Sequence, residues 1–172
     1  MKDARFEGVR GDQGCPPVCD PSMILIADDN ENDSILIVET LKAAGVKNQI
    51  MLVVDGKDVI AYLKGEQQYA DRATYPQPSI LLLDLRMPKI GGFEVLEWLK
   101  FAIPTRDILI VIFSGYAELS DIRRGYELGA RSFLPKPCRV EDIQNLVRAY
   151  STYWQVDNTT WHPRARQQTG PA

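Results

Sequence analysis

Acidic residues follow two apolar segments of this sequence at the point where each segment stops. Asp28 and Asp29 come directly after residues 23–27, and Asp84 ends the apolar run 80–83. Three carboxylates held close together repel one another and raise one another's pKa values, unless a divalent cation neutralises them. An oxygen-only site with room for water suits Mg²⁺ better than Zn²⁺. The pattern therefore predicts a magnesium site.

A hydroxyl and an amine follow two further apolar segments. Ser114 comes after residues 108–113, and Lys136 comes shortly after residues 132–134. Beside the acids, these groups could bind an anion that arrives at the metal. A carboxylate nucleophile with Mg²⁺, a lysine and a hydroxyl forms an acceptor for a phosphoryl group. Asp84 is the predicted nucleophile.

Neighbouring parallel strands would bring these residues together. Continuous apolar runs bounded by turn residues are typical of strands buried on both faces of a sheet. Five such segments alternate with helical patterns, at residues 23–27, 50–54, 79–84, 108–113 and 132–134. This alternation predicts an α/β fold, a flavodoxin-like, doubly wound five-stranded parallel sheet of order 2-1-3-4-5 with five helices. In that order the carboxyl ends that carry the polar residues are consecutive neighbours.

The helices are predicted from apolar residues at helical spacing. We expect Asp33 or Ser34 to cap the first helix, which ends at Gly45. Apolar residues at this spacing are Ile35, Val38 and Leu41 in the first helix, Leu119, Ile122 and Tyr126 in the fourth, and Val140, Ile143, Leu146, Val147, Tyr150 and Trp154 in the last.

Composition indicates one globular domain within the 172 residues, with 45% hydrophobic and 25% charged residues. We expect a flexible leader at residues 1–22, the domain at 23–154 and a polar tail at 155–172, too short for an output domain. The net charge of −3 with no basic stripe argues against nucleic acid. The sequence contains neither a run of roughly 20 apolar residues nor a signal peptide, so we expect a cytoplasmic protein.

Cysteine usage agrees with a reducing compartment. Cys15 and Cys19 lie in the leader, and Cys138 is far from them in the sequence. The single His162 lies near the other end, so a zinc site is disfavoured. We expect reduced thiols without a structural role.

The sequence resembles the receiver domains of two-component response regulators, the CheY-like family, over residues 23–154. Several separated motifs match in order: Asp28-Asp29, Asp84 with Met87-Pro88 and Gly91-Gly92, Ser114-Gly115, and Lys136-Pro137. The resemblance implies a protein that is not an enzyme. It would accept a phosphoryl group on Asp84 from a histidine kinase or phosphotransfer protein, and signal by binding a protein target.

The resemblance also implies roles for individual residues. Asp29, Asp84 and the backbone carbonyl of Arg86 would bind Mg²⁺ directly, and Asp28 would act through water. Lys136 would bind the phosphoryl group, and the Lys136–Pro137 peptide bond would be cis. The switch residues would be Ser114 and Phe133, and the residues that set the phosphoryl lifetime would be Arg86 and Tyr116.

Simpler interpretations stay open for several residues. Asp28 could merely begin a helix, Ser114 could be a turn residue, and Phe133 could be only a core aromatic. A Mg²⁺-dependent hydrolase is a second functional class, although Arg86 replaces the second acid of the Asp-x-Asp pair of such enzymes. A phosphate-independent scaffold is a third, which the intact acids disfavour.

A narrower resemblance is to stand-alone regulators that accompany phytochrome-type histidine kinases. It rests on residues 27–33, the long connection 62–78 and the aromatic residues 150–154. Tyr150, Tyr153 and Trp154 extend the apolar stripe of the last helix, so we expect a homodimer through this helix. The alternative is that these rings fold back onto the domain.

Overall fold

Five parallel strands form a single sheet in the computed structural model, which describes residues 23–102, 108–115 and 117–157. The strand order is β2-β1-β3-β4-β5, as predicted. Register places Ala27 of β1 beside Leu83 of β3, so the two strands end at the same level. The strands are β1 (Met23–Ala27), β2 (Gln49–Val53), β3 (Ile80–Leu83), β4 (Leu109–Ser114) and β5 (Ser132–Pro135).

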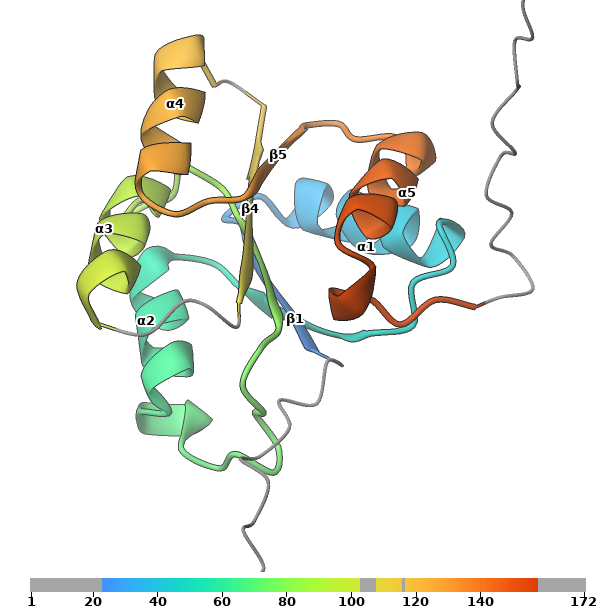
Figure 1. Cartoon of the computed structure of the whole chain (residues 1–172). Helices are drawn as coiled ribbons and strands as arrows, with labels where there is room; N and C mark the ends of the chain where they lie inside the picture. The colour runs from blue at the N-terminus through green and yellow to red at the C-terminus, as the bar shows by residue number, and fades with distance from the viewer. Residues whose placement is uncertain (1–22, 103–107, 116, 158–172) are drawn as a thin grey trace, which may run out of the picture.

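Helices cover both faces of the sheet. α1 and α5 lie on one face, and α2, α3 and α4 lie on the other (Figure 1). Successive strand residues point to opposite faces, so Leu25 and Leu81 pack against α2 and α3, whereas Ile24 and Ile80 pack against α1 and α5. The helices are α1 (Glu31–Ala43), α2 (Gly56–Lys64), α3 (Gly92–Ala102), α4 (Leu119–Glu127) and α5 (Val140–Ala149).

The first helix begins earlier than expected. Asn30 caps α1, because its side chain accepts a hydrogen bond from the backbone N–H of Asn32 at 3.0 Å. Ile37 and Leu41 are fully buried, but Ile35 is 49% exposed, so not every apolar residue that marks this helix faces the core. Two apolar stripes in this helix have helical spacing, and only packing against the sheet selects between them.

Two of the apolar residues that mark the fourth helix are also exposed. Leu119 is 77% and Tyr126 47% exposed, and Gly125 is the buried residue of α4. A Cβ atom at Gly125 would lie 2.1 Å from Cδ1 of Ile112. The helix therefore approaches β4 through a residue without a side chain, which hydrophobic periodicity cannot detect.

The chain after α5 folds back onto the domain. Trp154 is 7% exposed and belongs to the core beneath α1 and α5, so the expectation that it forms a contact surface is wrong. Val156 pairs with Val46 in an isolated antiparallel bridge, which the backbone hydrogen bond from Lys47 N–H to the Gln155 carbonyl extends. The folded part thus continues to at least Asp157, past the expected limit at residue 154.

Some sequence expectations fall on residues that the structure does not describe: the leader with Cys15 and Cys19, Tyr116, and the chain beyond Asp157 with His162. Cys138 is buried, and burial raises the pKa of its thiol to about 11, as expected of an unreactive cysteine. Among the described helices, none has the length and apolarity needed to cross a membrane.

Candidate phosphoryl and metal site

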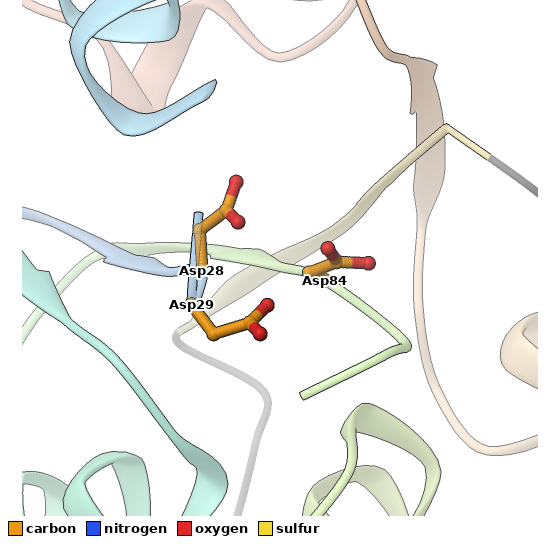
Figure 2. A group of neighbouring side chains, drawn as sticks. All are labelled: Asp28, Asp29 and Asp84. Atoms are coloured by element: carbon orange, nitrogen blue, oxygen red, sulfur yellow. The ribbon is translucent and has the colours of Figure 1, made fainter. Parts of the chain in front are cut away.

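Three carboxylates gather at the carboxyl edge of the sheet. Asp28 and Asp29 follow β1, and Asp84 follows β3, the strand beside it (Figure 2). One oxygen from each lies within 4.8 Å of the others. Asp28 and Asp84 are buried and Asp29 is exposed. The structure therefore brings the predicted acidic residues together at a site that solvent can reach.

Lys136 places a buried ammonium among these acids. Its Nζ atom donates a hydrogen bond to Oδ2 of Asp84 at 2.6 Å, and lies 2.6 Å from Oδ2 of Asp28 and 3.3 Å from Oδ2 of Asp33. Burial would lower the pKa of Lys136, but Asp28 and Asp84 outweigh this effect and raise it. The lysine is therefore charged at neutral pH. The Lys136–Pro137 bond is cis, as the resemblance implied.

The charge balance of the cluster fits a divalent cation. Burial raises the pKa of Asp28, with a partial offset from Lys136 and from the backbone N–H of Asn30. Lys136 contacts the buried Oδ2 of Asp28 outside hydrogen-bonding geometry, so this oxygen accepts no hydrogen bond within the described chain. Three carboxylates that share one ammonium keep a net negative charge, and a hard cation would compensate it.

A cavity of about 460 Å³ opens beside the acids. Its lining residues are Asp33, Asp84, Arg86, Ser114, Gly115, Lys136 and Pro137. Ser114 is only 2% exposed, and its backbone carbonyl accepts a hydrogen bond from the N–H of Lys136 at 3.2 Å. The ends of β4 and β5 thus hold Ser114 and Lys136 on the same cavity as Asp84.

One predicted functional residue lies away from the cavity, another is outside the described residues, and one residue of the cavity was missed. Phe133 is half-buried on β5 beside Ile112, and packs against the core beneath α2 and α3. Tyr116 lies outside the described residues. Asp33 was expected only as a helix cap. Its place five residues after Asp28, in the first turn of the following helix, is the signal that could have identified it.

The loop between β3 and α3 is held close to the neighbouring loop. Oδ1 of Asp84 accepts a hydrogen bond from the N–H of Arg86 at 3.1 Å. The buried Asp55, which caps α2, pairs with Lys89, and the Ile90 carbonyl accepts from the N–H of Gly56 at 3.0 Å. These contacts fix the backbone that follows the predicted nucleophile.

Comparison with known proteins decides the family. The sequence model of the response regulator receiver domain matches residues 24–148. The chain belongs to the response regulator receiver family. It is therefore the receiver domain of a response regulator in two-component signalling.

Two regulatory proteins are among its relatives. The chain is 29% identical to response regulator Rcp1 of Synechocystis over 78% of its own length and 89% of Rcp1. It is 33% identical to the probable methanogenesis regulatory protein FilR2 of Methanothrix harundinacea, over 78% of this chain and 84% of FilR2.

Solved receiver structures have the same fold. The phosphorylated cyanobacterial phytochrome response regulator RcpA is 31% identical, with a TM-score of 0.63 over 77% of this chain and 93% of RcpA. The Mn²⁺-bound form of Rcp1 is 29% identical, with a TM-score of 0.62 over 77% of this chain and 93% of Rcp1. The relatives thus include a receiver crystallised in its phosphorylated form and one crystallised with a divalent cation.

Proposed function

We propose that this receiver accepts a phosphoryl group on Asp84 from a histidine kinase or phosphotransfer protein, in a Mg²⁺-dependent reaction. The observation that supports this most is the position of Asp84, whose carboxylate lies in one cluster with those of Asp28 and Asp29 and contacts the ammonium of Lys136. The cavity beside it gives a phosphodonor access to the carboxylate. The likeness to RcpA and Rcp1 favours a phytochrome-type kinase as the donor.

The transfer step uses groups that line or adjoin the cavity. A carboxylate oxygen of Asp84 attacks the phosphorus of a phosphohistidine. The new O–P bond forms as the P–N bond breaks, and the histidine nitrogen leaves with the electron pair of the broken bond, which can then take up a proton. Lys136 neutralises charge on the phosphoryl oxygens. The protein then acts as a phosphoacceptor with at most slow self-dephosphorylation.

The residues suited to hold the cation are those of the acidic cluster. Asp29, Asp84 and the backbone carbonyl of Arg86 would bind Mg²⁺ directly, and the buried Asp28 would act through water. When bound, the cation would neutralise the negative charge that builds up around the phosphorus. Manganese in the Rcp1 structure supports a divalent cation in this family, and the oxygen-only ligands favour magnesium.

The phosphorylated state would be transmitted through Ser114 and Phe133. A phosphoryl group adds acceptor oxygens that draw the Ser114 hydroxyl inward. Phe133, on the strand beside Ser114, would move into the vacated space and change the surface of α4, β5 and α5, where a protein target would bind. Arg86, which lines the cavity, and Tyr116 would control the access of water and so the phosphoryl lifetime.

Replacement of Asp84 tests the proposal. Asp84→Asn keeps the shape of the side chain but removes the nucleophile, so we expect no phosphorylation by acetyl phosphate with Mg²⁺. Intact mass spectrometry should detect one phosphoryl group on the parent and none on the variant, and EDTA should abolish the gain. Asp71→Asn is the matched control, because Asp71 lies exposed in the connection before β3, and it should be labelled normally.

The same experiment separates the three functional classes. A phosphoacceptor gives stable, stoichiometric labelling, a hydrolase turns over the phosphodonor without accumulating label, and a scaffold does neither. Labelling of Asp84→Asn at the parental rate would refute Asp84 as the acceptor.

A further inference from the structure

Asp33 approaches the cavity lysine from a different element than the acidic cluster does. Its Oδ2 atom lies 3.3 Å from Nζ of Lys136, and it projects from the first turn of α1. Its side chain is 35% exposed, whereas those of Asp28 and Asp84 are 0% and 9% exposed. Asp33 also lines the cavity that a phosphodonor would enter.

Asp33 does not belong to the group of acids that could share a cation, so its effect on Lys136 differs from theirs. Among the described acids, those grouped tightly enough to share a cation are Asp28, Asp29 and Asp84. A cation bound there would compete with Lys136 for the oxygens of Asp28 and Asp84. The charge of Asp33 would remain available to the lysine.

We propose that Asp33 is a positioning residue for Lys136. Its carboxylate attracts the Lys136 ammonium and thereby lowers the affinity of the cavity for a phosphoryl group. This inference rests on the proposed phosphoacceptor function. Transfer to Asp84 removes the charge from the oxygen that Lys136 contacts. The phosphoryl oxygens and the Asp33 carboxylate then compete for the same ammonium.

Like charge adds to this competition. A phosphoryl group brings about −1.5 to −2 charge into the cavity that Asp33 lines. The Asp33 carboxylate repels it, and partial exposure to solvent reduces the repulsion without removing it. Replacement by asparagine leaves an amide oxygen that can still accept from Lys136, but removes the charge. The pocket should then bind a phosphoryl analogue more tightly.

Beryllium fluoride, which mimics an acyl phosphate on aspartate, provides the test. With Mg²⁺ present, Asp33→Asn should bind it roughly threefold to tenfold more tightly than the parent, as measured by fluorine NMR of the protein-bound species. The gain should shrink in high salt, because screening weakens charge repulsion but not packing. With acetyl phosphate, the half-saturating concentration should fall while the limiting rate stays close to the parental value. Asp33→Ala should also bind more tightly.

Glu31 offers a matched control in the same turn of α1. Glu31 is exposed, so Glu31→Gln removes a negative charge near the same helix end without removing a contact to Lys136. We expect its affinity for beryllium fluoride to stay within about twofold of the parent. Equal gains in both variants, or an unchanged or weaker affinity of Asp33→Asn, would overturn the role of Asp33. A parent that binds no beryllium fluoride would instead refute the proposed function, and the inference with it.

Discussion

At the scale of single residues, buried charges in this receiver are matched by specific partners. Lys136 neutralises part of the acidic cluster, and Lys89 does the same for Asp55, whose side chain is 2% exposed. Asp55 also accepts a hydrogen bond from the N–H of Asp58 at 2.9 Å and so caps α2. The charge of Asp55 therefore stabilises both a helix end and the loop that follows the predicted phosphoacceptor.

Asp55→Asn should lower the free energy of unfolding at neutral pH by about 1–3 kcal/mol, because it removes a charge-assisted interaction from a buried position. Burial tends to raise the pKa of Asp55, but Lys89 and the backbone N–H of Asp58 outweigh it and lower the pKa. A depressed pKa means that the charge stabilises the fold above the unfolded value near 3.8, and that this contribution is lost as pH falls through the folded value.

Urea unfolding of parent and variant from neutral to acidic pH measures this difference directly. The two proteins should converge in stability at low pH, where Asp55 is protonated. A difference that persists unchanged under acid would show that the charge is not its source.

At the scale of elements, the loop from β3 to α3 depends on close backbone contacts. A Cβ atom on Gly92 would lie 2.3 Å from the carbonyl oxygen of Asp84 and 2.8 Å from Cα of Leu85. A Cβ on Gly91 would meet Oε2 of Glu94 at 2.9 Å, at the end of a flexible side chain. The first residue of α3 must therefore be glycine if the helix is to begin so close to the predicted phosphoacceptor.

Gly92→Ala should cost about 1–3 kcal/mol of unfolding free energy, because the new methyl group forces the backbone of Asp84 and Leu85 to move. Gly91→Ala should cost less, since Glu94 can turn away. Urea unfolding measures both costs. We also expect slower phosphorylation of Gly92→Ala by acetyl phosphate. Equal stability losses at the two glycines would contradict this explanation.

At the scale of the whole molecule, the chain after α5 completes the core instead of leaving it. Trp154 packs against the residues beneath α1 and α5. The side chain of the buried Asn48 forms hydrogen bonds with the residues on either side of Trp154. The amide nitrogen of Asn48 donates to the Tyr153 carbonyl at 3.2 Å, and its oxygen accepts from the N–H of Gln155 at 2.8 Å. A homodimer through the last helix stays a prediction, but Trp154 no longer supports it.

Trp154→Ala should destabilise the domain by about 3–5 kcal/mol, as expected when a large buried aromatic is truncated. Trp154→Phe should lose less, because most of the ring volume remains. Urea unfolding gives the stability, and light scattering gives the molar mass, which we expect to stay the same in both variants. A change in molar mass for Trp154→Phe at unchanged stability would restore Trp154 as a contact residue.

Much of the site was predictable from the sequence because the end of each buried strand can be recognised from the neighbouring residues. Each buried strand is a continuous apolar run, and a polar residue directly after it must emerge at the carboxyl edge of the sheet. Asp28, Asp29, Asp84 and Ser114 could therefore be placed from their positions alone. The order of the strands came from the alternation with helices, and the resemblance to receivers assigned the roles.

Tertiary packing decided what local patterns leave ambiguous. Ile35 and Ile37 both fit a helical stripe, and only contact with the sheet buries one of them. Gly125 makes the contact between α4 and β4 without any apolar side chain. Trp154 turns inward because residues distant in the sequence form an apolar surface against which it packs. The sequence by itself determined which groups stand at the strand ends. The folded chain alone determined that Asp33 meets Lys136, since residues about a hundred positions apart are joined only by tertiary contacts.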